Sequence, residues 1–140
     1  YYEINELGDN YYMSEISAAI GIEQLKKLNR LNKRRKIIAK TYNTELKIEE
    51  KMPYNENSSY HLFWIRVKNR EKLRRYLNSV GIQTGIHYLP IHKFNLYKTK
   101  DKLPITESVG NEIITLPMHA NLTNSQVEKI IFYVNKFLNK

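Results

Sequence analysis

The longest patterned stretch of the chain lies near its start. Apart from one glycine it holds no helix breaker, and its apolar residues form two successive stripes at helical spacing, in residues 16–28 and 31–46. Ser14 is placed to cap the helix N-terminus, and the charge of Glu15 complements the helix dipole in the first turn. The phase between the stripes slips near residues 29–32, which predicts either two helices or one bent helix.

Short runs of β-branched and aromatic residues follow. They predict three strands, at residues 61–67, 82–88 and 113–116. Between the first two strands we expect a helix that begins after Asn69 and stops at Gly81, because glycine accepts the left-handed conformation that ends many helices. Before the last strand we expect a short helix that starts at Thr106, preceded by a loop.

The C-terminal segment predicts an amphipathic helix. Thr123 and Gln126 match a capping box, in which each side chain accepts a hydrogen bond from the other residue's backbone amide. Apolar residues then recur at helical spacing, at Val127, Ile130, Ile131, Val134 and Leu138. Together the elements predict an α+β fold: a small, mainly antiparallel three-stranded sheet with helices packed on one side, preceded by a long helical segment.

Length and composition limit the class of protein. A chain of 140 residues with 41% hydrophobic residues suits one domain with a packed core. No apolar run approaches the roughly 20 residues of a membrane span, and the start lacks the basic region of a signal peptide. Because the chain starts at Tyr1 and not at methionine, we expect it to be the tail of a longer polypeptide.

The absence of cysteine and the net charge limit the kinds of site and partner that the chain can have. The absence of cysteine excludes disulfides, thiolate zinc sites and cysteine nucleophiles, and it suits a cytoplasmic location. The net charge of +9 raises nucleic acid as a partner, but no recognition-helix or base-stacking motif accompanies it. We therefore expect no nucleic-acid partner and keep a basic, non-enzymatic binding module as an alternative. Its candidate helix, residues 30–42, carries Arg30, Lys33, Arg34, Arg35, Lys36 and Lys40.

Candidate binding residues cluster at the end of the second predicted strand. His87, Tyr88 and His92 place two imidazoles and a phenol around Pro90, a set that suits sugar hydroxyls or a diphosphate. The alternative is a structural turn. As a metal site the segment is poor, because no third ligand lies close in sequence. The other two histidines are interpreted as structural: His61 in a core strand and His119 in a loop.

Three segments carry a family resemblance: residues 7–25, 81–92 and 115–119. In this order and at this spacing they resemble the C-terminal third of the DegT/StrS family of aminotransferases. That family has fold type I, the aspartate aminotransferase fold. Its members use pyridoxal 5'-phosphate and mostly aminate keto-sugars attached to nucleotides. The resemblance covers essentially the whole chain.

The resemblance implies specific roles. The lysine that forms the Schiff base with the cofactor would precede Tyr1, so the chain itself holds no catalytic residue and is expected to be inactive alone. Asn10 matches the asparagine that reaches the cofactor phosphate of the other subunit of a homodimer. Tyr12 stands where many relatives have arginine. Residues 1–30 would link to the missing large cofactor domain, and residues 31–140 would form the small C-terminal domain.

The function that this resemblance implies is transfer of an amino group, from glutamate as donor, to a nucleotide-linked keto-sugar in polysaccharide or amino-sugar biosynthesis. Within the same fold, a cofactor-dependent dehydratase or an amino-benzoate synthase remains an alternative. A third possibility is a partly folded, inactive gene fragment. In that case the first helical stripe would be left exposed, and the isolated chain would self-associate.

Overall fold

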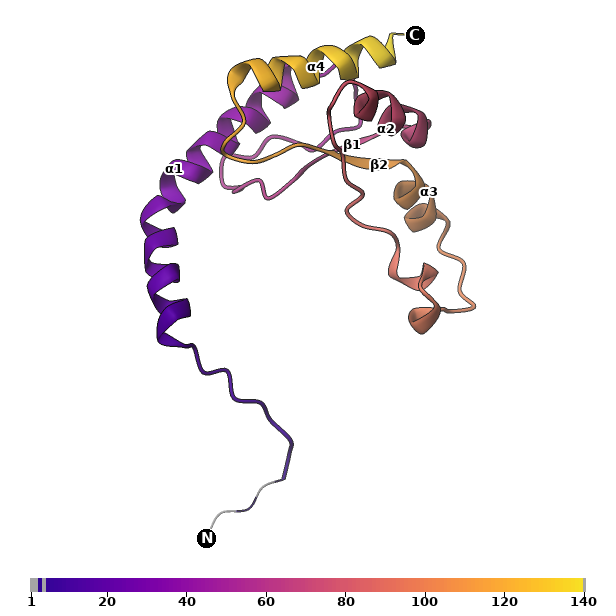
Figure 1. The fold of residues 1–140 in the computed structure, drawn as a ribbon. Coiled ribbons are helices and arrows are strands. Elements are labelled where there is room, and N and C mark those ends of the chain that lie inside the picture. The colour runs from indigo at the N-terminus through magenta and orange to yellow at the C-terminus, as the bar shows by residue number, and fades with distance from the viewer. Residues whose placement is uncertain (1–2, 4, 140) are drawn as a thin grey trace.

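The first regular element is one long helix. In the computed structural model, which describes residue 3 and residues 5–139, α1 runs without interruption over Glu15–Glu45. Ser14 caps it as predicted, since its hydroxyl accepts a hydrogen bond from the Ser17 amide at 3.2 Å. Figure 1 shows a single curving helix whose N-terminal half extends away from the rest of the molecule. Of the two alternatives, the single helix is therefore confirmed.

The two apolar stripes of α1 have different surroundings. In the first stripe Ile16 and Leu25 are 75% and 68% exposed, whereas the second stripe buries Ile38, Ala39 and Tyr42 in the core. The helix has no proline, so nothing in its backbone forces a break at the phase slip. The slip marks the place where α1 begins to pack against the other elements.

Two strands form the sheet. β1, Phe63–Arg66, pairs antiparallel with β2, Ile113–Leu116, in a register that sets Phe63 opposite Leu116. Because alternate side chains of a strand point to the same face, Phe63 and Ile65 share the buried face with Ile114 and Leu116. The antiparallel pairing is as predicted.

The third predicted strand, residues 82–88, does not form. Within this segment, Gly85 alone pairs with the sheet: its amide and the Thr115 amide donate hydrogen bonds to each other's carbonyl at 3.1 and 2.9 Å. After this single bridge the chain leaves the sheet, and the His87 side chain folds back onto Thr115. β2 is only four residues long, and its free edge offers little further length to pair.

Three more α-helices complete the fold: α2, Arg70–Ser79; α3, Pro104–Glu112; and α4, Asn124–Leu138. Two short 3-10 helices, Ile91–Lys93 and Asn95–Tyr97, lie between α2 and α3. Gly81 ends the α2 region with a φ of 78°, the left-handed conformation expected of it. The predicted start of α3 at Thr106 is wrong by two residues, because Pro104 occupies the first helical position, where proline is favoured. The capping box of α4 is present in full.

One core joins these elements. Buried side chains of α1, α2 and α4 pack on the apolar face of the sheet, which agrees with helices on one side, and Figure 1 shows α4 lying across the end of α1 above the strands. The Tyr42 ring meets Phe63 edge to face, with 5.2 Å between ring centroids. Burial raises the pKa of the Tyr42 phenol, and its hydroxyl donates to the Pro117 carbonyl at 2.9 Å.

Candidate functional site

The His87–His92 segment lies where the chain leaves the sheet. Gly85 is required there, because a Cβ at this position would lie 2.4 Å from Cε1 of His87 and 2.9 Å from the Thr115 hydroxyl. His87 Nδ1 and the Thr115 hydroxyl are hydrogen-bonded at 2.7 Å, which fixes the imidazole over the sheet edge. The Tyr88 ring meets His87 edge to face at 4.9 Å and is 71% exposed, so its phenol is free to contact a ligand.

His92 faces a different neighbour. Its side chain is only 9% exposed, and Nε2 lies 3.5 Å from Oε1 of Glu107 on α3. The second oxygen of Glu107 is 2.5 Å from the ammonium of Lys93, and that hydrogen bond lowers the pKa of the Glu107 carboxyl. His87 is therefore hydrogen-bonded to β2, whereas His92 is enclosed beside Glu107 of α3, so the two imidazoles have different neighbours.

Two arginines fasten α3 to its neighbours, Arg66 from β1 and Arg70 from the start of α2. Arg66 contacts Glu112 at 2.6 Å through Nε and the Ser108 hydroxyl at 3.1 Å through Nη2, and the hydrogen bond with Glu112 raises its pKa. Arg70 donates to the carbonyl of Gly110 at 2.5 Å. A Cβ on Gly110 would lie 2.5 Å from the Pro90 ring, so α3 and the segment before His92 are in close contact. This network positions the His87–His92 segment.

The remaining histidines are both exposed. The prediction that His61 lies in a core strand is wrong, because β1 begins two residues later and the His61 side chain is turned to solvent. It lines a groove of about 250 Å³ together with His87 and Gly85. His119 lies in the loop after β2, as predicted, and its carbonyl accepts a hydrogen bond from the Leu122 amide.

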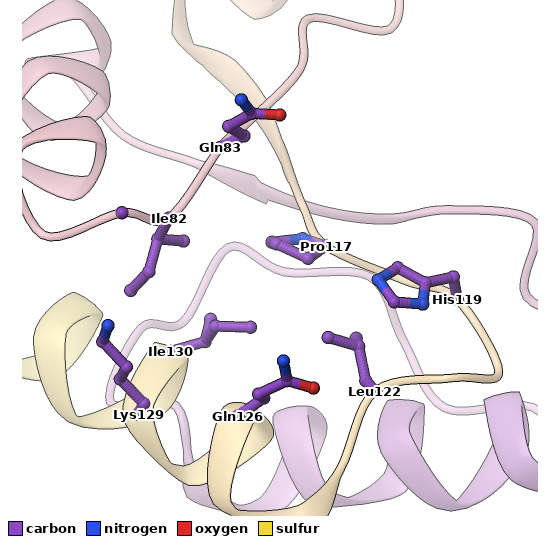
Figure 2. Close-up of a pocket in the computed structure, with 9 residues that line it drawn as sticks. Ile82, Gln83, Pro117, His119, Leu122, Gln126, Lys129 and Ile130 are labelled. Carbon is purple, nitrogen blue, oxygen red and sulfur yellow. The ribbon is translucent and has the colours of Figure 1, made fainter.

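Sequence reasoning missed a second pocket. A hollow of about 440 Å³ lies between the end of α2, the loop after β2 and the start of α4, and Figure 2 shows its lining. Gln83, Gln126 and Lys129 bring polar groups to its edge. The sequence marked Gln126 for the capping box, a structural role, and Gln83 only as part of the segment 81–92 that carries the family resemblance. Lys129 lies on α4 one turn after Gln126, whereas Gln83 comes from a distant segment that the fold brings to α4.

Asn10 lies in the arm of residues 5–14, which has no regular structure and precedes α1. Asn10 is exposed, as are Tyr11 and Tyr12 at 90% and 92%. Figure 1 shows the arm running away from the folded body beyond the projecting half of α1. The Asn10 amide is therefore open to a group supplied by another chain or domain, which is the situation that its predicted role requires.

Part of the basic face of α1 forms hydrogen bonds with other segments of the fold. The Arg34 guanidinium holds α4, donating to the Leu122 carbonyl and to Asn124 Oδ1. Arg35 donates to the Ser59 carbonyl at 2.9 Å. Two of the six basic residues of the alternative binding helix thus serve packing, which weakens the case for a nucleic-acid surface.

Further observations on the described residues concern metal binding, membrane spans and the exposure of lysines. They contain no group of three or more His, Asp or Glu side chains arranged to hold a metal ion, and none of their helices is long and apolar enough to cross a membrane. Every lysine among them is at least partly exposed.

Comparison with known proteins identifies the protein family to which the chain belongs. The profile of the DegT/DnrJ/EryC1/StrS aminotransferase family matches residues 1–135. The chain is 33% identical over 137 residues to dTDP-3-amino-3,6-dideoxy-alpha-D-galactopyranose transaminase from Aneurinibacillus thermoaerophilus, covering 93% of this chain and 38% of that protein. The aminotransferase TlmJ from Streptoalloteichus hindustanus superposes with a TM-score of 0.85 at 30% identity, over 98% of this chain and 40% of that one.

A third similar protein was solved with its cofactor. Spr1654 from Streptococcus pneumoniae, solved in a PLP form and a PMP form, matches with a TM-score of 0.80 at 27% identity, over 89% of this chain and 35% of that one. These likenesses define an α+β domain of the aminotransferase class. The chain belongs to the DegT/DnrJ/EryC1/StrS aminotransferase family, as its three sequence segments predict. It spans about two fifths of the length of these relatives.

Proposed function

We propose that this chain is the C-terminal part of a pyridoxal-phosphate-dependent aminotransferase that moves an amino group from glutamate to a nucleotide-linked keto-sugar in the cytoplasm. The observation that carries the proposal is the family match over residues 1–135. A relative named as a transaminase of a dTDP-linked amino-sugar supports the sugar-nucleotide substrate. Residues 1–30 would link to the large cofactor domain, and residues 31–140 would form the small domain.

The residues present fit one end of the cofactor. When bound, pyridoxal phosphate supplies an electron sink for transamination. Asn10, exposed just ahead of the N-terminus of α1, offers an amide donor to the cofactor phosphate of the other subunit in a homodimer. Tyr12 in the same arm adds no positive charge, so this contact would rest on the amide alone. The imine-forming lysine would lie before Tyr1.

The His87–His92 segment would form the rim of the substrate site. His87 and Tyr88 present polar ring atoms near the edge of the sheet, and neutral imidazole and phenol groups suit sugar hydroxyls. His92 is mostly enclosed against α3, so it would act on the substrate chiefly by fixing the position of the segment. The exposed apolar residues of the first α1 stripe would be covered in the complete enzyme.

The first test locates the Schiff base. The polypeptide encoded by the reading frame extended upstream of Tyr1, treated with pyridoxal phosphate and borohydride, is expected to be labelled at one lysine before Tyr1. The 140-residue chain, treated in parallel, is expected to show no lysine labelled above the others, because its described lysines are all at least partly exposed. Mass spectrometry of the digested products measures both. Clean labelling of a single lysine within the 140-residue chain would contradict the proposal.

The second test concerns Asn10. In the extended polypeptide, Asn10→Ala is expected to weaken cofactor binding about ten- to a hundredfold, the loss of one hydrogen bond to a charged group. Asn5→Ala in the same arm is the matched control and is expected to leave binding unchanged, since both side chains are exposed. The measurement is the dissociation constant of the cofactor from its absorbance. Equal constants for the two variants would rule out the phosphate role.

A further inference from the structure

The pocket beside α4 combines an apolar floor with a polar edge. Side chains of Ile82, Pro117, Leu122 and Ile130 form the floor, and Figure 2 shows them grouped at the centre of the hollow. Three of the four belong to segments that the core fixes, since Ile82, Leu122 and Ile130 are at most 6% exposed. The floor is therefore a preformed surface on which the carbon skeleton of a ligand can lie.

The polar edge consists of hydrogen-bond donors. Gln126 Oε1 already accepts a hydrogen bond from the Thr123 amide at 2.9 Å, as part of the capping box. This bond fixes the orientation of the side-chain amide, so its NH₂ group remains to donate, and Figure 2 shows that nitrogen directed toward the hollow. Gln83 lies across the hollow, and His119 lies beside Pro117.

The charge around the pocket is positive. Lys129, one turn after Gln126, lines it, and no carboxylate is among the lining residues. Among the described residues, none forms an ion pair or hydrogen bond with the Lys129 ammonium at contact distance. Glu128, its neighbour in sequence, lines a different hollow on the other side of α4. A cation without a partner, beside amide donors and without acids, favours an anionic ligand.

We propose that this pocket binds a small organic phosphate, with the phosphate at Gln126 and Lys129 and the carbon skeleton on the floor. A phosphate carries nearly two negative charges and three acceptor oxygens, so it gains more from the Lys129 ammonium and the Gln126 amide together than a singly charged carboxylate does. The volume of about 440 Å³ suits a ligand of this size. The lining residues include none of Asn10, His87, Tyr88 and His92, although Gln83 and Pro117 also line the groove beside His87. The proposal does not depend on the proposed function.

The experiment titrates the ¹⁵N-labelled 140-residue chain with phenyl phosphate, inorganic phosphate and phenol, and follows the backbone amide shifts. Phenyl phosphate is expected to give saturable shifts confined to residues 81–83, 117–122 and 126–130, with a dissociation constant of about 0.1–1 mM. Inorganic phosphate is expected to bind about tenfold more weakly, because it leaves the floor uncovered. Phenol alone is expected not to saturate.

Two variants separate the site from general attraction to a basic protein. Gln126→Glu keeps the capping box, which accepts glutamate at this position, but places a carboxylate in the pocket, so phenyl phosphate should bind at least about tenfold more weakly. Lys129→Ala should weaken binding about fivefold. Lys136→Ala, near the other end of α4, should change nothing. The proposal is overturned if Gln126→Glu binds as tightly as the original chain, if phenol binds equally well, or if the shifts fall mainly on the basic residues of α1.

Discussion

Replacing Phe63 with alanine is expected to lower the free energy of unfolding by about 3–5 kcal/mol, a large part of the total stability of a small domain. Phe63 is fully buried, it meets the Tyr42 ring edge to face, and it lies in β1 beneath the helices. Its removal leaves a cavity between α1 and the sheet. Chemical denaturation followed by circular dichroism measures the change.

A matched control uses the same substitution at the surface. Phe132 on α4 is 58% exposed, and Phe132→Ala is expected to cost less than about 1 kcal/mol. If Phe63→Ala does not fold, Ile65→Val in the same strand gives a smaller expected loss of about 0.5–1.5 kcal/mol. Equal losses for the two phenylalanines would show that β1 does not carry the core.

Gly85→Ala is expected to displace His87 and break its hydrogen bond with Thr115. The new Cβ would lie 2.4 Å from the imidazole, closer than packed atoms approach, and a side chain moves more readily than a paired backbone. The loss of this bond is expected to cost about 1–2 kcal/mol of stability. The imidazole ¹⁵N shifts of His87 measure the displacement directly, and denaturation measures the cost.

A glycine-to-alanine substitution elsewhere in the chain is not expected to lower stability. Gly21 lies inside α1, and a Cβ added there would have nothing within 4 Å, so Gly21→Ala is expected to be neutral or to raise helix stability by up to about 1 kcal/mol. Unchanged His87 shifts in Gly85→Ala would mean that the close approach at the sheet edge is relieved by the backbone, and that Gly85 does not position His87.

The sequence predicted well those features that depend on neighbours in the chain. The Ser14 cap, the Gly81 stop and the capping box of α4 each rest on contacts within a few residues, and the structure has all three. The two core strands also appear where the β-branched and aromatic runs predict them. The family resemblance, carried by three short segments, is confirmed by the match over residues 1–135.

The errors at residues 82–88 and at His61 come from pairing between distant segments. Residues 82–88 have a strand-like composition, yet a strand needs a partner edge, and β2 offers one residue, Thr115, to pair with Gly85. His61 has the pattern of a core position but lies outside β1, whose extent is set by its register with β2. Local propensity cannot specify where a partner strand ends.

In the candidate site, too, some features could be predicted from the sequence and others depended on the tertiary structure. Sequence alone predicted His87, Tyr88 and His92 as a group of binding residues from their side-chain chemistry, and it predicted Asn10 as a cofactor contact from the family resemblance. Only the tertiary structure decided that His87 is hydrogen-bonded to Thr115, that His92 is enclosed beside α3, and that Asn10 lies free on an arm. It also brought Gln83 to the start of α4 to form the second pocket. Local order follows from hydrogen bonds and caps within a few residues, whereas the surroundings of a side chain depend on packing between segments far apart in the chain.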